Sequence, residues 1–361
     1  MATADASTYT IQNLLEKAQE NIDALQYDVA HKFCLRALEQ DNAHAEALEQ
    51  TAAVELELGL FHNALQRLNR CVELFPDTGY SKYMYLGQMA EGKDAIAHFQ
   101  KGAGILRTAR QASDLDAAQR AALSTQLGAA LCSMAEIYLT DCCFEPEAEA
   151  SCEQLLEEAV TVDPQSPEVY QLMASVRLSQ QRIKEGRTML LKGLALWQDQ
   201  DPSDARYPSY DARIATTKLL LELELFDEAL HVLGALQKED DQTVDLWYLY
   251  GWTYYCLGED VKQAINTAKS DAESEERAAE HRAHFRDAVE CLTTAISIHQ
   301  QVGHDDEGIL AHAQELLETI GRDFSLDALL AEAQKVDDNP KKGQALLDAI
   351  ASDDEAQMVT D

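Results

Sequence analysis

The sequence predicts an all-α fold, a solenoid of about seven helical hairpins with a capping helix at its C-terminal end. Three observations predict it. First, Ala45–Thr78 has the length of one two-helix repeat, 34 residues, with Gly59 between two amphipathic patterns and Pro76 after the second. Second, the preceding 34 residues carry small and apolar side chains at matching positions. Third, weaker copies of the same pattern continue to about residue 320.

The first two repeats are in register with each other. Small or apolar residues recur at the positions where two antiparallel helices must touch. In the first repeat these are Leu14, Ala18, Ala30, Cys34 and Ala37, and in the second they are Leu48, Ala52, Ala64, Leu68 and Cys71. We therefore expect these side chains to build the contacts within and between the hairpins.

The third and fourth repeats depart from this length. The third begins at Gly79 and fits only if its first helix is one turn shorter, whereas its second helix continues toward Ala112 because no helix-breaking residue comes earlier. In the fourth, a long first helix from Gln119 to Tyr138 is followed by a widened loop around Cys142–Pro146. Its second helix is expected to end at Pro164.

The remaining repeats are separated by a linker and a charged segment. The fifth repeat begins at Pro167, because proline is favoured in the first helical turn, and the linker Gln200–Ser209 separates it from the sixth. The seventh opens with an aromatic helix from Trp247 to Gly258. A charged segment, residues 259–283, follows it as an extended helix or a mobile insertion. A last helix, Ile309–Ile320, would cover the end of the stack.

This pattern resembles the tetratricopeptide repeat in its 34-residue period, its glycine between helices and the aromatic, glycine and aromatic slots at Tyr250, Gly251 and Tyr254. The resemblance covers roughly residues 10–320 and implies that the first helix of each repeat lines a concave groove. Accordingly, we expect a flexible N-terminus (1–9), a tetratricopeptide-repeat solenoid (10–322, with the charged segment 259–283) and an acidic, partly disordered tail (323–361).

The chain is strongly acidic. Sixty-four Asp and Glu residues against 29 Lys and Arg residues leave a formal charge of −35, which disfavours direct binding of nucleic acid and favours a basic protein as the partner. The N-terminus lacks the apolar core of a secretory signal, and no run of eighteen apolar residues occurs. These features predict a protein of the cytoplasm and nucleus that does not contact membranes and is monomeric before it binds its partner.

No motif for catalysis, metal binding or cofactor binding stands out. The chain has no phosphate-binding glycine loop, no GxSxG and no HExxH sequence, and its eight cysteines include no CxxC pair. The cluster formed by Cys132, Cys142, Cys143 and Cys152 has none of the usual zinc spacings. We therefore expect no enzyme, no metal site and no cofactor.

The resemblance to tetratricopeptide repeats places groove residues at the second, fifth, ninth and twelfth positions of each repeat. Six carboxylates fall on such positions: Glu46, Glu49, Glu136, Glu168, Asp211 and Asp245. Two segments are also depleted of basic residues. Ala121–Val176 contains ten acidic residues and no Lys or Arg, and Leu219–Val261 contains ten acidic residues and one Lys. A column of carboxylates in a concave surface would attract a cationic segment.

Three aromatic residues of the seventh repeat also fall on groove positions: Tyr248, Trp252 and Tyr255. They are candidate anchors for the partner, since an aromatic face can hold Lys or Arg by cation–π attraction. The alternative is that other parts of the chain cover them, because exposed aromatic patches are unusual in the absence of a partner.

The overall layout is similar to the fungal family of assembly chaperones dedicated to the fourth protein of the large ribosomal subunit. The similarity lies in seven degenerate repeats, the YLYGWTYYCLGE helix followed by a charged segment, and the acidic tail. It implies capture of that newly made ribosomal protein by its long basic internal loop, in an acidic groove, and escort to the nuclear pre-ribosome. Two alternatives stay open: a general tetratricopeptide scaffold in a multiprotein complex, and a chaperone of another basic protein such as a histone.

Overall fold

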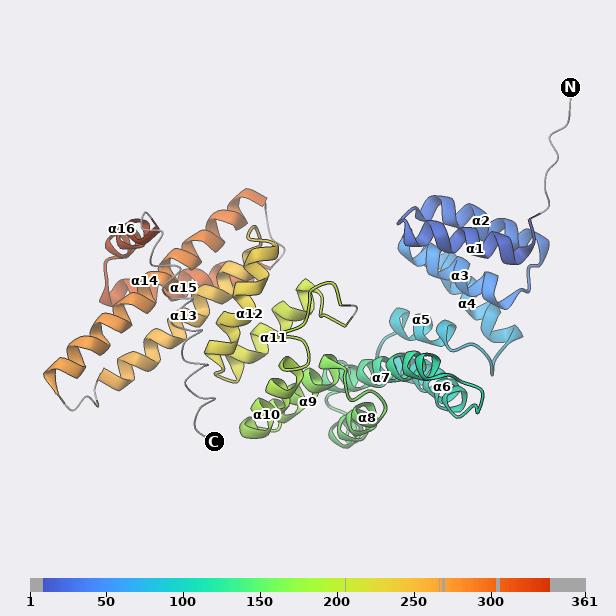
Figure 1. Ribbon diagram of the computed structural model, residues 1–361, viewed down its shortest axis with the longest axis horizontal. Helices are drawn as coiled ribbons and strands as arrows, with labels where there is room; N and C mark the ends of the chain where they lie inside the picture. Colours follow the sequence, from blue (N-terminus) through green and yellow to red (C-terminus); the bar gives the residue numbers. More distant parts are fainter. Residues whose placement is uncertain (1–8, 205, 266, 268–269, 303–305, 338–361) are drawn as a thin grey trace, which may run out of the picture. The chain divides into compact units, whose positions relative to one another are not determined.

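The computed structural model describes residues 9–337 except 205, 266, 268–269 and 303–305 (Figure 1). Within these residues the secondary structure consists of sixteen α-helices and no strand. The contacts divide the chain into two units, residues 1–199 and 200–361. None of the described helices is both long enough and apolar enough to cross a membrane.

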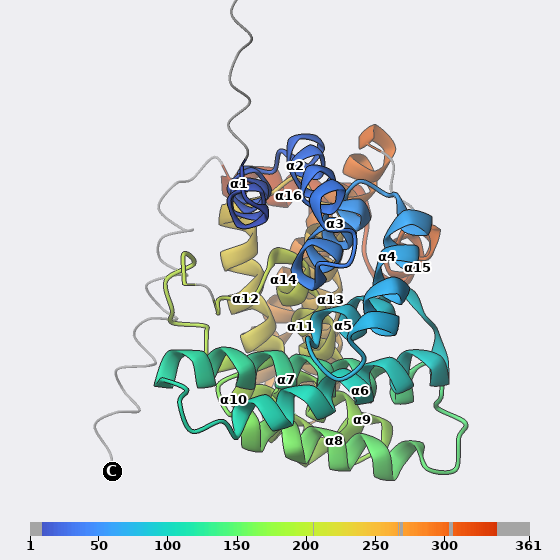
Figure 2. The ribbon, with the colours of Figure 1, turned by 90° about the vertical axis from the view of Figure 1, so that its right-hand side faces the viewer.

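Unit 1 (residues 1–199) contains the five repeats that the sequence predicts. Its helices are α1 (Ile11–Asp23), α2 (Tyr27–Gln40), α3 (Ala45–Glu57), α4 (Phe61–Leu74), α5 (Ser81–Met89), α6 (Gly92–Arg110), α7 (Ala117–Leu139), α8 (Ala148–Val162), α9 (Pro167–Ser179) and α10 (Ile183–Leu194). Each helix packs against its neighbour within the hairpin, and Figure 2 shows α7 beside α6 and α8. The short α5 and the long α6 and α7 confirm the predicted departures in the third and fourth repeats.

The core of unit 1 follows the repeat pattern. The ten small and apolar residues at the matching positions of the first two repeats, five in each repeat, are at most 3% exposed. Ala18, Ala30, Cys34 and Val54 form one cluster, and Ala52, Ala64, Leu68 and Leu86 form the next. Small side chains let the helices approach closely, while burial of each Leu contributes about 1.5–3 kcal/mol. The repeat pattern therefore specifies the packing as well as the helices.

Unit 2 (residues 200–361) contains α11 (Tyr210–Glu222), α12 (Phe226–Glu239), α13 (Val244–Ile265), α14 (Asp271–Val302), α15 (Glu307–Asp323) and α16 (Leu326–Asp337). The charged segment 259–283 continues α13 and begins α14 in its described part, which agrees with the extended-helix alternative. Glycine at position 251 allows the two long helices to pack closely, because a Cβ atom there would lie 2.6 Å from Leu292 Cγ.

The C-terminal helices continue beyond the predicted capping helix. Helix α15 confirms the helix expected over 309–320. The tail expected from residue 323 begins with α16, which packs against α14 through the fully buried Leu329. Its described part therefore belongs to the helical body, because Leu329 meets the apolar side of α14. The predicted flexible residues 1–8 and the rest of the tail, 338–361, lie outside the described residues.

Four of the turns between paired helices share one backbone conformation. Leu25, Gly59, Gln181 and Glu224 each lie fourteen residues after the first residue of their hairpin and have φ angles of 58°, 71°, 59° and 54°. This left-handed conformation ends the first helix, and glycine adopts it without strain. Three of the four turns therefore carry a residue that is strained at this position.

We expect Leu25→Gly to raise the free energy of unfolding of unit 1 by about 1 kcal/mol, because it removes left-handed strain. Leu25 is 73% exposed, so the change removes little packing. Gly59→Ala is the converse, since a Cβ atom there meets nothing within 4 Å and only the backbone conformation opposes it. Urea denaturation should show a higher free energy of unfolding for Leu25→Gly and a similarly lower one for Gly59→Ala. A lower value for both variants would contradict the strain argument.

Candidate functional site

Two of the predicted groove carboxylates of unit 1 come together. Glu136 lies near the end of α7 and Glu168 in the first turn of α9. Glu168 is exposed as a whole residue, yet desolvation of its carboxyl group raises its pKa above the ordinary value, and the negative charge of Glu136 raises it further. The negative charge of Glu136 in one repeat therefore acts on the carboxyl group of Glu168 in the next repeat.

Asp163, at the end of α8, joins these two carboxylates around the buried thiol of Cys132. Burial is the main reason that the pKa of Cys132 is raised, and the charges of Glu168, Glu136 and Asp163 add to it. We call Glu136, Asp163 and Glu168 the α7–α9 carboxylates. In the part of the chain that the structure describes, no Lys, Arg or His forms an ion pair with any of them. Three like charges therefore act on the same buried thiol, and none of them has an ion-pair partner among the described residues.

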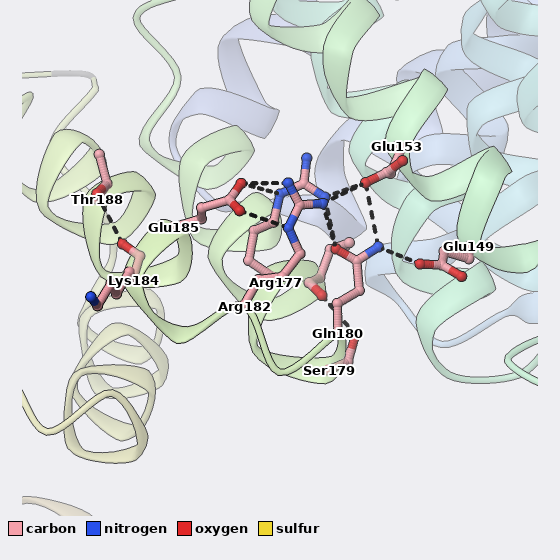
Figure 3. Close-up of polar contacts among 10 residues, drawn as sticks. Glu149, Glu153, Arg177, Ser179, Gln180, Arg182, Lys184, Glu185 and Thr188 are labelled. Carbon is pink, nitrogen blue, oxygen red and sulfur yellow. Dashed lines mark hydrogen bonds and ion pairs between the residues drawn. The ribbon is translucent and has the colours of Figure 1, made fainter.

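Other carboxylates of the same basic-depleted segment are satisfied internally. Glu158 pairs with Arg107, with N–O distances of 2.6 and 2.8 Å. Figure 3 shows that Arg177 and Arg182 lie between Glu153 and Glu185 and pair with both. These ion pairs connect α8 with the α9–α10 hairpin. Arginine residues outside the depleted segment thus neutralise Glu153 and Glu158. They form no ion pair with the α7–α9 carboxylates among the described residues.

The groove carboxylates of the second repeat differ from each other. Glu46 is exposed in the first turn of α3. Glu49 is half-buried and lies 3.5 Å from Nζ of Lys82, a side chain with no exposed area. Lys82 also donates hydrogen bonds to the carbonyl groups of Thr78 and Gly79. Glu49 therefore serves as a counterion inside the protein, and Glu46 is the member of this pair that faces solvent.

The two predicted carboxylates of unit 2 line one pocket of about 520 Å³. Asp211 belongs to α11 and is exposed, whereas Asp245 belongs to the first turn of α13 and is half-buried. Lys218 Nζ lies 2.9 Å from Asp245 Oδ1. Sequence reasoning missed Lys218, although it occupies the ninth position of the sixth repeat. The same groove rule, applied to basic residues as well as acidic ones, would have found it.

The three candidate aromatic anchors have internal partners. Tyr248 is 7% exposed, its hydroxyl group lies 2.7 Å from Nδ1 of His312, and the Trp252 ring packs edge-to-face on the same histidine. The Tyr255 ring stacks on Phe285 with centroids 5.7 Å apart. This corrects the expectation that Tyr248 is an exposed anchor, because α15 covers that face of α13. Trp252 and Tyr255 are half-buried, and a binding role for them stays a prediction.

No group of three His, Cys, Asp or Glu residues placed to hold a metal ion occurs among the described residues. The cysteines Cys132, Cys142 and Cys152 are buried, and burial raises the pKa of the Cys152 thiol to about 11. Buried thiols such as that of Cys152 behave as small apolar groups. The acidic residues described above, Glu46, the α7–α9 carboxylates and Asp211, have the charge that suits a cationic partner.

Comparisons with known proteins identify close relatives. No protein-family model matches the chain. It is 33% identical over 323 residues to a "Probable assembly chaperone of rpl4" from Schizosaccharomyces pombe, covering 89% of this chain and 91% of the relative. A protein of the same description from Emericella nidulans is 32% identical over 364 residues, covering 96% and 90%. The solved structure of "Assembly Chaperone of RpL4 (Acl4) (Residues 1-338)" is 31% identical, with a TM-score of 0.67 over 71% of this chain and 99% of that one.

Proposed function

The chain belongs to the family of assembly chaperones of rpl4, and on that premise we propose that it binds the newly made rpl4 of its own cell, the client. In this proposal the client's long basic internal loop contacts acidic surfaces formed by the first helices of the repeats. The chaperone keeps the loop from aggregating and from premature contacts with RNA. It then escorts the client from the cytoplasm to the nuclear pre-ribosome.

The observation that supports this proposal most is the arrangement of the α7–α9 carboxylates. They come from neighbouring repeats and lack an internal counterion among the described residues. Bringing like charges together is unfavourable, and a Lys or Arg of the client placed among them would reverse that penalty. An arginine is especially suitable, because its guanidinium group can donate to two carboxylates at once.

Release of the client can follow from competition between two polyanions. RNA presents a denser array of negative charge than a protein surface, so it would compete for the same basic loop at the pre-ribosome. The acidic surface of the chaperone would therefore act as a temporary substitute for RNA. This exchange requires no catalysis, and the proposal assigns none to the chain.

A binding experiment with purified proteins tests the proposal. The full chain would be titrated with labelled rpl4, with rpl4 that lacks its internal loop, and with a second basic ribosomal protein of similar charge. We expect tight binding of intact rpl4 and weak binding of the other two. Equal binding of all basic proteins, a histone included, would favour a general chaperone of basic proteins. Absence of binding to rpl4 would contradict the proposal and leave the scaffold role.

A further inference from the structure

We infer that the pocket between α11 and the start of α13 receives one lysine or arginine side chain of the basic client, and that Lys218 occupies it until the client binds. This inference rests on the proposed function and concerns a surface of unit 2 alone. It assigns two roles: Asp211 and Asp245 bind the incoming cation, and Lys218 competes with that cation. The pocket would thereby select clients whose cation binds better than the internal lysine.

The pocket is large enough to hold one long side chain. Its volume of about 520 Å³ falls within the range of small-ligand pockets, about 300–1,000 Å³. One wall is a single face of α11, formed by residues spaced as on one side of a helix: Asp211, Ile214, Ala215 and Lys218. Ile214 and Ala215 provide an apolar surface for the methylene stem, while the charged group would reach the carboxylates.

The opposite wall is held in place by hydrogen bonds. Tyr210 Oη lies 2.8 Å from Thr243 Oγ1 and donates to the carbonyl oxygen of Asp240 at 3.3 Å. Asp240 Oδ1 accepts a hydrogen bond from the backbone N–H of Gln242 at 2.8 Å. These bonds fix the loop between α12 and α13. The loop and the first turn of α13 therefore present Asp240 and Asp245 from a preorganised support.

The pocket lining contains more acidic than basic residues. Asp211, Asp240 and Asp245 line it, and Lys218 is the one basic residue in its lining. Lys218 and Asp245 form an ion pair at 2.9 Å, but the lysine side chain is 45% exposed and the carboxylate 23%. Exposed ion pairs contribute only about 0.2–1 kcal/mol. A client cation can therefore take the place of the Lys218 ammonium group beside Asp245 and add attraction to Asp211.

Arginine should compete better than lysine for this position. Lys218 carries a compact ammonium group that contacts one carboxylate, whereas a guanidinium group presents five N–H donors in a planar fork. Asp211 and Asp245 both line the pocket, so a fork of this kind has spare donors for Asp211 when it pairs with Asp245. Displaced Lys218 can extend into solvent, because almost half of its side chain is already exposed.

The test measures the affinity of the full chain for purified rpl4 by fluorescence anisotropy. Lys218→Met keeps the stem and removes the competing charge, so we expect binding to tighten by about three- to tenfold. Asp211→Asn combined with Asp245→Asn should weaken binding by a similar factor. In that double variant, adding Lys218→Met should no longer tighten binding. Thermal unfolding would verify that each variant keeps the native fold.

Lys184→Met is the matched control. It changes the net charge equally, and Lys184 is an exposed lysine on α10 in the other unit. If Lys218→Met changes affinity no more than this control, or weakens binding, the inference is overturned. If the wild-type chain does not bind rpl4 at all, the proposed function fails first. The two failures are therefore distinguishable within one set of titrations.

Discussion

Reversing the charge of both Glu136 and Glu168 to lysine is expected to weaken rpl4 binding by about 30- to 150-fold at physiological salt. Each reversal removes an attraction of about 0.2–1 kcal/mol and adds a repulsion of similar size. Together these four changes sum to about 0.8–4 kcal/mol of binding free energy, and the middle of that range, about 2–3 kcal/mol, gives the stated factor. The double variant should fold normally, because both residues are exposed and neither has an ion-pair partner in the part of the chain described.

The control for this prediction is the double reversal Glu20→Lys and Glu157→Lys. Both residues are exposed, on α1 and α8, and neither is among the groups whose charge acts on Cys132 or Glu168. The change in net charge is identical. We expect less than about a fivefold loss of affinity, since only long-range attraction changes. Equal losses for the two variants would mean that total charge, rather than this surface, governs binding.

Glu55→Ala should have the largest effect on stability, lowering the free energy of unfolding of unit 1 by about 3 kcal/mol. Glu55 has no exposed area, and Arg67 Nε donates to both of its carboxylate oxygens at 2.8 Å. His31 Nε2 lies 3.1 Å from Oε1, so one carboxylate joins α2, α3 and α4. Removing it leaves Arg67 with a poorly compensated charge and opens a cavity between three helices.

Glu57→Ala is the matched control, because Glu57 lies on the same helix and is exposed. It should change the free energy of unfolding by less than about 0.5 kcal/mol. Urea denaturation followed by circular dichroism measures both variants. A loss of under about 1 kcal/mol for Glu55→Ala would show that the buried ion pairs do not hold the first two repeats together.

The repeat architecture was predictable because it depends on local spacing. Helical periodicity and the 34-residue repeat identify residues such as Ala52 and Leu68, and both are fully buried. The charge of Glu136 acts on Glu168 of the next repeat, and a role for both residues in a groove stays a prediction. Sequence reasoning therefore performs well wherever each repeat contacts only the next.

The features that escaped prediction depend on contacts between distant segments. Glu55 and Lys82 look like surface residues in the sequence, but their partners come from other helices and allow burial. Tyr248 occupies a groove position, yet its side chain is covered by α15. The contact is made by His312, which lies 64 residues further along the chain. A local pattern gives no information about such long-range packing, so the aromatic anchors could not be separated from core residues by sequence alone.

The salt dependence of rpl4 binding tests most directly whether the chaperone recognises its client by complementary charge. The dissociation constant would be measured at several salt concentrations between roughly 50 and 300 mM, a range over which the screening length falls by more than half. We predict that affinity decreases by at least about tenfold across this range, because many exposed charge pairs contribute. An affinity that does not change with salt would contradict the account and place the main binding energy in apolar contacts.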